Sequence, residues 1–466
     1  MKKIALAIGF TLLWQTIVIC QQKSPNVVLV FADDLGYGDL ATFGNPEIKT
    51  PYLDQLAKEG QKWTHFYVAD PVCTPSRAGL LTGRYPIRSG MTSKKRGVLF
   101  PDSAKGLPHS EITIAELLKD KGYKTAMVGK WHLGHLPNYL PMQQGFDSYY
   151  GIPYSNDMEV TKEGQQAYIE GRHNPFFEPD YRHYQVPLME NEKIIERPVN
   201  QTTITQRYTD QAIAFIKKNK EQPFFLYVAH SMPHIPLFKP KDMVMADHAS
   251  HYAAVIQSID TSVGRIIESL KELQIEEQTL FIFTSDNGPW LSYTTHGGSA
   301  GPLRAGKGTT FEGGQRVPTV FWSPGRVMPK VVRDMGATLD LLPTICELAG
   351  VPLPKDRVLD GQSLLKTLTS GANSPRKEFF YWAFGELHAY RKGPWKLHLK
   401  QRAPVNYGKQ IALEHPELYH LRADIGERYN VAEKNESLVA SMQKDITRHL
   451  ESTKNALPDQ LEARIE

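Results

Sequence analysis

The segment from Asn26 to Asp39 constrains the fold more than any other part of the chain. Residues 27–32 are all apolar, and Asp33 and Asp34 follow at once, in a loop that contains two glycines. A continuous apolar run of this length is typical of a strand that is buried on both faces of a parallel sheet. The acids that end it indicate a functional loop at the carboxyl end of that strand.

Three more apolar runs end in polar residues, and helical patterns separate them. The runs span residues 125–128, 224–229 and 280–283, and they lead into Lys130 and His132, His230 and His234, and Asp286 and Asn287. Helical patterns occupy residues 53–57, 114–118, 212–216 and 251–273. This alternation predicts an α/β doubly wound sheet. Because ligands bind at the carboxyl ends of such strands, the polar residues are expected to share one site.

Asp33, Asp34, Asp286 and Asn287 form a set of hard oxygen ligands. Taken singly, Asp-Asp-Leu-Gly and Asp-Asn-Gly are also typical of turns. In a shared pocket, however, adjacent carboxylates repel each other unless a cation lies between them. A set without a Cys or His pair at zinc spacing favours Ca²⁺ or Mg²⁺.

Cys73 opens the run Cys-x-Pro-x-Arg, which ends at Arg77 and continues into Leu-Thr-Gly-Arg. Ser76 is expected to cap a short helix, which places Cys73 just ahead of a helix N-terminus that favours negative charge. An arbitrary lone Cys is most often a small buried thiol, and Cys346, on an apolar helical face, is interpreted in that way.

The run from Cys73 to Arg77 resembles the signature of the type I sulfatases, in which this Cys is oxidised to formylglycine. The hexapeptide from Gly129 to Gly134 looks like the second signature of that family. The resemblance extends over nearly the whole chain after residue 20 and is closest to the subgroup of arylsulfatase A and N-acetylgalactosamine-6-sulfatase. It implies an alkaline-phosphatase-like fold, with a large, mostly parallel sheet between helices and a smaller C-terminal antiparallel sheet plus helix.

The same resemblance implies the roles of the site residues. One Ca²⁺ is held by Asp33, Asp34, Asp286, Asn287 and the modified Cys73. Arg77 holds the hydrated aldehyde.

Around the sulfate, Lys130 and Lys307 bind the anion, and Ser155 supplies a pocket hydroxyl. One hydroxyl of hydrated formylglycine attacks sulfur, and His132 deprotonates the other hydroxyl. Either His234 or Lys307 protonates the departing sugar oxygen. Glu312 and Arg316 are possible supports, and His230 is expected to pack.

The implied partners are a sulfated oligo- or polysaccharide and the enzyme that makes formylglycine. Two alternatives stay open from the residues. One is a phosphatase or phosphonate hydrolase of the same superfamily, which would often carry a second metal set. The other is a non-catalytic protein that binds sulfated glycans with Cys73 left as a thiol.

Residues 1–20 are expected to be a signal peptide, with Lys2 and Lys3 before an apolar run at 4–19. The protein is therefore predicted to be exported, periplasmic or secreted, with no membrane span. Lipid attachment through Cys20 is the minor alternative. Residues 21–350 are assigned to a catalytic sulfatase domain and 351–466 to a C-terminal subdomain.

A formal charge of +4 over 466 residues is small and argues against nucleic acid as the partner. The densest basic cluster, Lys94-Lys95-Arg96, is interpreted as a solvated loop. Residues 159–198 are expected to form a substrate-shaping loop. Arg391 and His398 are placed either at the pocket rim or on the surface.

Overall fold

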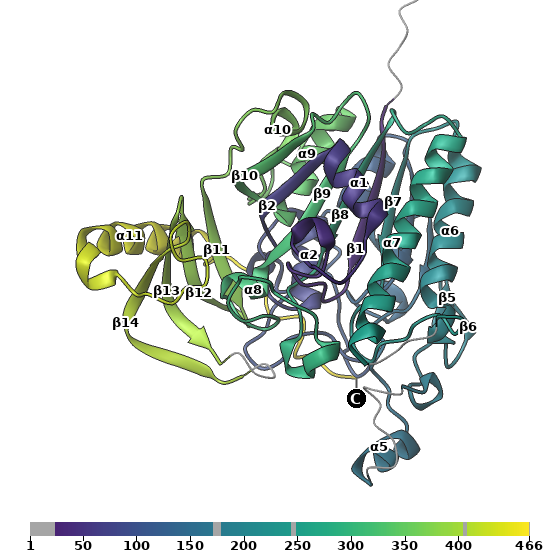
Figure 1. The fold of residues 1–466 in the computed structure, drawn as a ribbon, viewed down its shortest axis with the longest axis horizontal. Coiled ribbons are helices and arrows are strands. Elements are labelled where there is room, and N and C mark those ends of the chain that lie inside the picture. The colour runs from purple at the N-terminus through teal and green to yellow at the C-terminus, as the bar shows by residue number, and fades with distance from the viewer. Residues whose placement is uncertain (1–23, 171–178, 244–247, 404–407, 466) are drawn as a thin grey trace, which may run out of the picture.

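The computed structural model describes residues 24–170, 179–243, 248–403 and 408–465 (Figure 1). The predicted signal peptide and Cys20 lie outside these residues. Among the helices described, none combines the length and apolar character that a membrane crossing needs.

A ten-stranded sheet runs through the larger part of the molecule, in the order β10-β2-β9-β8-β1-β7-β3-β4-β5-β6. Its strands are β1 (Asn26–Ala32), β2 (Gln61–Tyr67), β3 (Lys124–Gly129), β4 (Ser148–Gly151), β5 (Leu188–Glu190), β6 (Lys193–Glu196), β7 (Phe224–Ala229), β8 (Thr279–Ser285), β9 (Arg316–Trp322) and β10 (Lys330–Ala337). Strands β8, β1, β7, β3 and β4 are parallel, whereas β9 is antiparallel to both β8 and β2. The predicted mixed, mostly parallel sheet is confirmed.

Helices cover both faces of this sheet, as Figure 1 shows. They are α1 (Pro51–Glu59), α2 (Cys73–Thr82), α3 (Pro86–Ser89), α4 (Ile114–Asp120), α5 (Lys162–Ile169), α6 (Ile204–Asn219), α7 (His248–Glu272), α8 (Glu312–Gln315), α9 (Leu341–Ala349), α10 (Leu365–Ser370) and α11 (Glu436–Ser452). Alternate β1 residues face opposite cores: Val28 and Val30 pack with α1, α6 and α7, and Val27 and Leu29 pack with α2, α4 and α9. All four are fully buried, and each contributes about 1.5–3 kcal/mol of hydrophobic stabilisation.

The second, four-stranded sheet lies at the left of Figure 1. It consists of β11 (Glu378–Ala383), β12 (Glu386–Lys392), β13 (Trp395–Arg402) and β14 (Gln410–His420), all antiparallel. A third core joins Phe379 and Tyr381 of β11 to Tyr67 of β2 and Ala337 of β10. The predicted small antiparallel sheet is therefore present, and it docks on the β2 and β10 edge of the large sheet.

Two details of the predicted organisation change. Residues 159–198 are not one irregular loop, because they contain α5, β5 and β6, although residues 171–178 are outside the described part. Cys346 is fully buried in the core that α9 forms with the sheet, which confirms its interpretation as a core thiol.

A buried ion pair fixes the segment that connects the two sheets. Arg376, just before β11, donates from Nε to Asp340 at 2.8 Å, and its other contacts include the Asp360 carbonyl. Asp340 is fully buried and also accepts from the backbone N–H groups of Ala337 and Gln362.

We expect Asp340→Asn to lower the free energy of unfolding by about 3–5 kcal/mol, because it leaves the Arg376 guanidinium buried without its counter-charge. Urea unfolding followed by circular dichroism measures this. The control is Asp356→Asn, which breaks the exposed pair between Asp356 and Arg357 and should leave the midpoint unchanged. Equal midpoints for both variants would contradict a supporting role for the buried pair.

Candidate active site

Cys73 is the first residue of α2, which is buried along its whole length. The predicted cap is wrong: the helix starts at Cys73 with Val72 as its N-cap, and Ser76 is inside it. The reason is that the Ser76 N–H already bonds the Val72 carbonyl at 3.1 Å, so the first helical turn closes before Ser76. Cys73 therefore lies within the first turn and not ahead of it.

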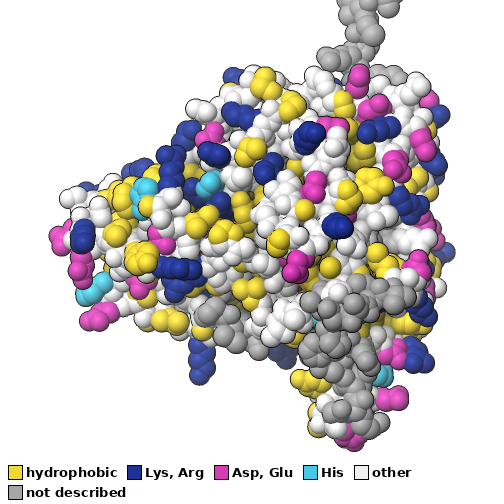
Figure 2. All heavy atoms as spheres, in the orientation of Figure 1, with side chains coloured by type: hydrophobic (Ala, Val, Ile, Leu, Met, Phe, Trp, Pro, Cys, Tyr) yellow, Lys and Arg dark blue, Asp and Glu magenta, His cyan; other side chains and the backbone are white. Residues whose placement is uncertain are grey.

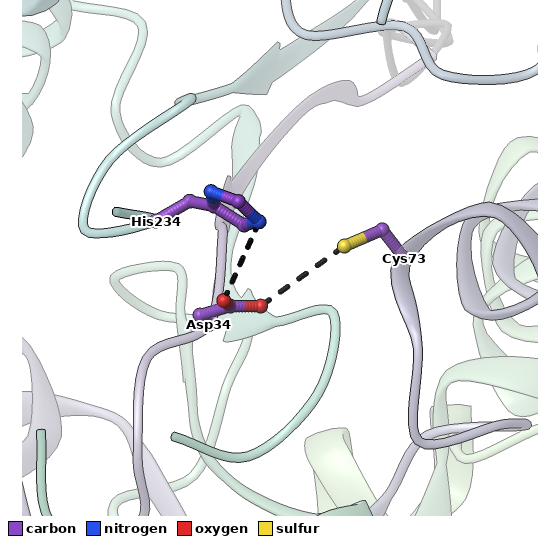
Figure 3. Close-up of side chains that lie close together, drawn as sticks. All are labelled: Asp34, Cys73 and His234. Carbon is purple, nitrogen blue, oxygen red and sulfur yellow. Dashed lines mark hydrogen bonds and ion pairs between the residues drawn. The ribbon is translucent and has the colours of Figure 1, made fainter. Parts of the chain in front are cut away.

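The predicted acids meet where β1 and β8 end side by side. One carboxylate oxygen each from Asp33, Asp34 and Asp286 lies within 4.8 Å of the others and of Cys73 Sγ. The sulfur is 3.4 Å from Asp33 Oδ1 and 4.0 Å from Asp34 Oδ1. Figure 3 shows Cys73 and His234 both facing Asp34. The backbone at Asp34 is left-handed (φ 64°), a conformation that few non-glycine residues adopt.

Three buried cations balance these three acids. Arg77 donates from Nη2 to Asp286 at 2.8 Å, and Lys130 Nζ lies 2.6 Å from Asp33 Oδ2. Lys307 Nζ lies 2.8 Å from Asp34 Oδ2. Because charges of both signs are desolvated here, each depends on its partners.

The pKa values of the acids reflect this balance. Burial raises the pKa of Asp33, but the charges of Lys130 and Arg77 outweigh burial and hold it at about 2. Burial raises the pKa of Asp34 to about 7, against the opposing charge of Lys307 and with the help of Asp33 and Asp286. Burial and Asp286 also raise the pKa of the Cys73 thiol.

The residues fit a hard divalent cation. The Asn287 amide donates to Asp34 Oδ1 at 2.7 Å, while its own Oδ1 is buried and has no hydrogen-bond partner among the described residues. An oxygen left in this state beside three carboxylates is a ready ligand for Ca²⁺. With the cation, the net charge of the cluster would rise from zero to +2, a charge that an anionic ester offsets.

Lys130, Ser155, His234 and Lys307 lie together, as predicted. Lys130 Nζ is 3.2 Å from Ser155 Oγ, which is 3.4 Å from His234 Nε2. Lys307 Nζ lies 4.2 Å from the centre of the Trp290 ring. His234 Nδ1 donates to the Ile235 carbonyl, so Nε2 is the atom that must gain a proton before His234 can act as an acid.

His132 is arranged as a base. Its Nε2 is 2.9 Å from the Leu99 carbonyl, which only accepts, so Nε2 carries the hydrogen and Nδ1 is the free acceptor. Nδ1 is buried, and no residue in the described part of the chain forms a hydrogen bond with it. Burial, together with Lys130 and Arg77, keeps the pKa of His132 well below its usual value, and the ring is neutral. Thr74 Oγ1 bonds the His132 carbonyl and the Leu99 N–H, which joins the two segments.

Cys73, His132, Ser155, His234 and Lys307 line a cleft of about 350 Å³. Sequence reasoning missed other lining residues, namely Arg96, Phe100, Asp157, Met158, Trp290, Phe384 and Arg402. Asp157 and Trp290 each follow a predicted site residue closely, and that proximity is a signal that could have found them. Phe384 and Arg402 come from the ends of β11 and β13 and carry no such signal.

The basic run at residues 94–96 is not only a solvated loop. Lys94 and Lys95 are exposed, but all three residues line the cleft. The Arg96 side chain is only 11% exposed, because it packs 4.6 Å from the Phe100 ring centre and pairs with Asp102. The same loop is joined to α2 by the Leu99 N–H, which donates to Thr74 Oγ1 at 3.1 Å.

Arg391 and His398 are neither on the rim nor on the surface. Arg391 contacts Glu312 at 3.8 Å, and His398 Nε2 is 2.8 Å from Glu427; all of these side chains are buried. Glu312 also pairs with Arg316, so both belong to this network and not to the cleft. His230 is buried and lies 3.2 Å from Ser262 Oγ, which confirms that it packs.

Two family models match the chain: the sulfatase model over residues 25–351 and the C-terminal region of aryl-sulfatase over residues 374–464. Arylsulfatase A from Homo sapiens is 39% identical over 88% of this chain and 83% of its own. N-acetylgalactosamine-6-sulfatase from Mus musculus is 35% identical over 95% of this chain and 89% of its own.

Solved structures agree with these matches. The PsFucS1 sulfatase from Pseudoalteromonas sp. superposes with a TM-score of 0.82 at 29% identity, over 93% of this chain and 91% of that one. Ps i-CgsB in complex with k-i-k-neocarrahexaose superposes with a TM-score of 0.77 at 31% identity, over 95% of both chains. With this fold, this cleft and these relatives, the chain belongs to the sulfatase family and is a hydrolase of sulfate esters.

Proposed function

We propose that this sulfatase removes sulfate from a sulfated carbohydrate, with formylglycine made from Cys73 as the nucleophile and one Ca²⁺ ion. The observation that carries the proposal is the position of Cys73, whose sulfur lies 3.4 Å from Asp33 in a cleft that His132, His234 and Lys307 also line. Formylglycine would supply a hydrated aldehyde as the nucleophile, and Ca²⁺, which Asp33, Asp34, Asp286, Asn287 and residue 73 would hold, would supply positive charge at the sulfate.

The remaining chemistry belongs to the chain's own side chains. Lys130 and Lys307 bind the sulfate oxygens and offset the charge that grows on them. Arg77 holds Asp286 and orients residue 73 from the same helix. His132 Nδ1 accepts a proton from residue 73, so that sulfate leaves and the aldehyde returns. His234 gives a proton to the departing sugar oxygen, with Lys307 as the other candidate.

The rim of the cleft supports a carbohydrate ester as the substrate. Trp290 and Phe384 offer ring faces on which the apolar side of a sugar can pack, and Arg96 and Arg402 add positive charge around them. Relatives point the same way, because one is named for N-acetylgalactosamine 6-sulfate and one solved structure holds neocarrahexaose. The division proposed from the sequence, at residue 350, makes Phe384 and Arg402 contributions of the C-terminal subdomain.

The formylglycine proposal includes a maturation enzyme and export. Cys73 is 1% exposed at the start of a buried helix, so the maturation enzyme would have to act before this helix is packed. Residues 1–20 are proposed to direct export to the periplasm or the medium.

The central experiment is mass spectrometry of the peptide that contains residue 73. We expect an aldehyde in place of the thiol, and we expect Cys73→Ala to keep its circular dichroism spectrum while losing hydrolysis of 4-nitrophenyl sulfate. A purified, active protein with an unmodified thiol would contradict the proposal, as would turnover by Cys73→Ala.

Asp286→Ala should lose bound calcium and activity together, because it removes one ligand and leaves Arg77 without its nearest carboxylate. Metal content per chain, measured by plasma mass spectrometry, and the rate on 4-nitrophenyl sulfate check this. A variant with the calcium content and rate of the parent would show that the metal lies elsewhere.

His234→Ala should slow hydrolysis of a sugar sulfate roughly 10²–10⁴-fold, since a sugar alkoxide leaves only with a proton. Nitrophenolate departs without one, so 4-nitrophenyl sulfate should lose far less. The measurement is the ratio of the losses in kcat/KM on the two substrates. Equal losses would remove His234 from the acid role and transfer it to Lys307.

A further inference from the structure

A second hollow, lined mainly by basic side chains, lies between the two sheets and away from the cleft. Its walls come from β2, β9 and β10 of the large sheet, from β12, and from the segments before β11 and after β14. Its volume is about 990 Å³, against about 350 Å³ for the cleft. We name it the basic groove. Of its thirteen lining residues seven are Arg or Lys, while Asp334 is the one acid. Figure 2 shows Lys and Arg side chains gathered over this junction.

The floor of the basic groove consists of buried guanidinium groups. Arg316, Arg376 and Arg391 are 2%, 4% and 5% exposed. Arg376 is paired with Asp340. Three other cations, Arg316, Arg391 and Lys396, all contact Glu312. Among the described residues, Glu427 is the second carboxylate of this group and pairs with Lys396. Three cations therefore meet two carboxylates, which leaves the floor with net positive charge.

The rim adds cations that are not neutralised. Arg333 and Arg422 are exposed, and neither forms an ion pair with any residue that the structure describes. Among the described residues, the Lys377 ammonium donates to the Ser374 carbonyl and forms no ion pair, whereas Lys392 is paired with Asp445. The single acid, Asp334, accepts the Ser374 N–H at 3.0 Å.

The pKa of His65, on the wall of the groove, reflects this positive charge. Burial, together with Arg316 and Arg391, lowers its pKa to about 3, and Arg422 acts in the same direction. An anion in the groove would thus meet fixed guanidinium groups below and free cations at the rim, the arrangement that favours sulfate and carboxylate groups.

Strand β12 connects the two sites. It begins after Phe384, which lines the cleft, and ends at Lys392, which lines the groove. Seven residues of strand span roughly 20 Å, too far for a mono- or disaccharide to occupy both sites.

We infer that the basic groove is a second binding site for a polyanionic glycan chain, so that the enzyme holds a sulfated polymer at the groove while it acts on the same polymer in the cleft. The inference rests on the proposed function and narrows its substrate to chains. The groove is assigned binding alone, and catalysis stays in the cleft.

The test uses the full-length protein and fluorescein-labelled heparin as the probe. Arg333→Gln combined with Arg422→Gln should weaken heparin binding roughly tenfold and lower the slope of log Kd against log salt by about 2, one for each charge removed. The control, Lys217→Gln with Lys218→Gln on α6, removes two exposed charges that form no ion pair with the described residues from another surface, and should change Kd less than twofold. Equal losses in the two pairs would overturn the groove as a site, as would unchanged binding by the groove pair.

Two more measurements test which class of polyanion the groove binds and whether one chain bridges the groove and the cleft. Tighter binding of a DNA duplex than of heparin would overturn the glycan assignment. In the parent, long heparin fragments should inhibit 4-nitrophenyl sulfate hydrolysis more strongly than a heparin disaccharide does. In the Arg333→Gln/Arg422→Gln variant this difference should disappear, while kcat/KM without inhibitor stays unchanged. Equal inhibition by long and short fragments in the parent would overturn the bridging. Heparin binding is measured without turnover. A protein that lacks sulfatase activity would therefore refute the proposed function, while the heparin measurements would still decide whether the groove is a binding site.

Discussion

The structure depends on a buried cluster of opposite charges at the carboxyl end of the sheet. Asp33, Asp34 and Asp286 face Arg77, Lys130 and Lys307, and all six side chains are almost wholly withdrawn from water. In such surroundings no charge is stable without the others. The strands that bring these groups together therefore position both the nucleophile and the groups that bind the anion.

A second buried cluster joins this centre to the C-terminal sheet. Glu312 lies five residues after Lys307 and accepts from Tyr67 of β2, Tyr381 of β11 and Lys396 of β13. The loop that carries Lys307 is thus held at one end by the small sheet. The same sheet brings Phe384 and Arg402 to the cleft and Lys392 to the basic groove. The C-terminal part consequently contributes residues to both the cleft and the basic groove.

Much of the large sheet and its site could be predicted because the signals are local. An apolar run followed by Asp33 and Asp34 indicates a buried strand and its functional end within a few residues, and the runs before Lys130, His234 and Asp286 do the same. Parallel strands share one edge at their carboxyl ends, so these residues meet whatever the exact strand order. The prediction that Ser76 caps the helix was wrong, because the sequence pattern does not show which backbone N–H closes the first helical turn.

The sequence by itself determined the chemistry of this protein: which acids, lysines and histidines stand at strand ends, and that Cys73 lies close to the N-terminus of a helix. The tertiary structure alone decided what surrounds that chemistry. Phe384 and Arg402 reach the cleft, and Arg391 reaches the groove beside Arg316, through the docking of one sheet on another. That docking depends on contacts between residues up to some three hundred positions apart, such as Tyr67 with Tyr381 and Phe379. Side-chain packing between residues so far apart produces no periodic pattern in the sequence, and it therefore could not be predicted from the sequence.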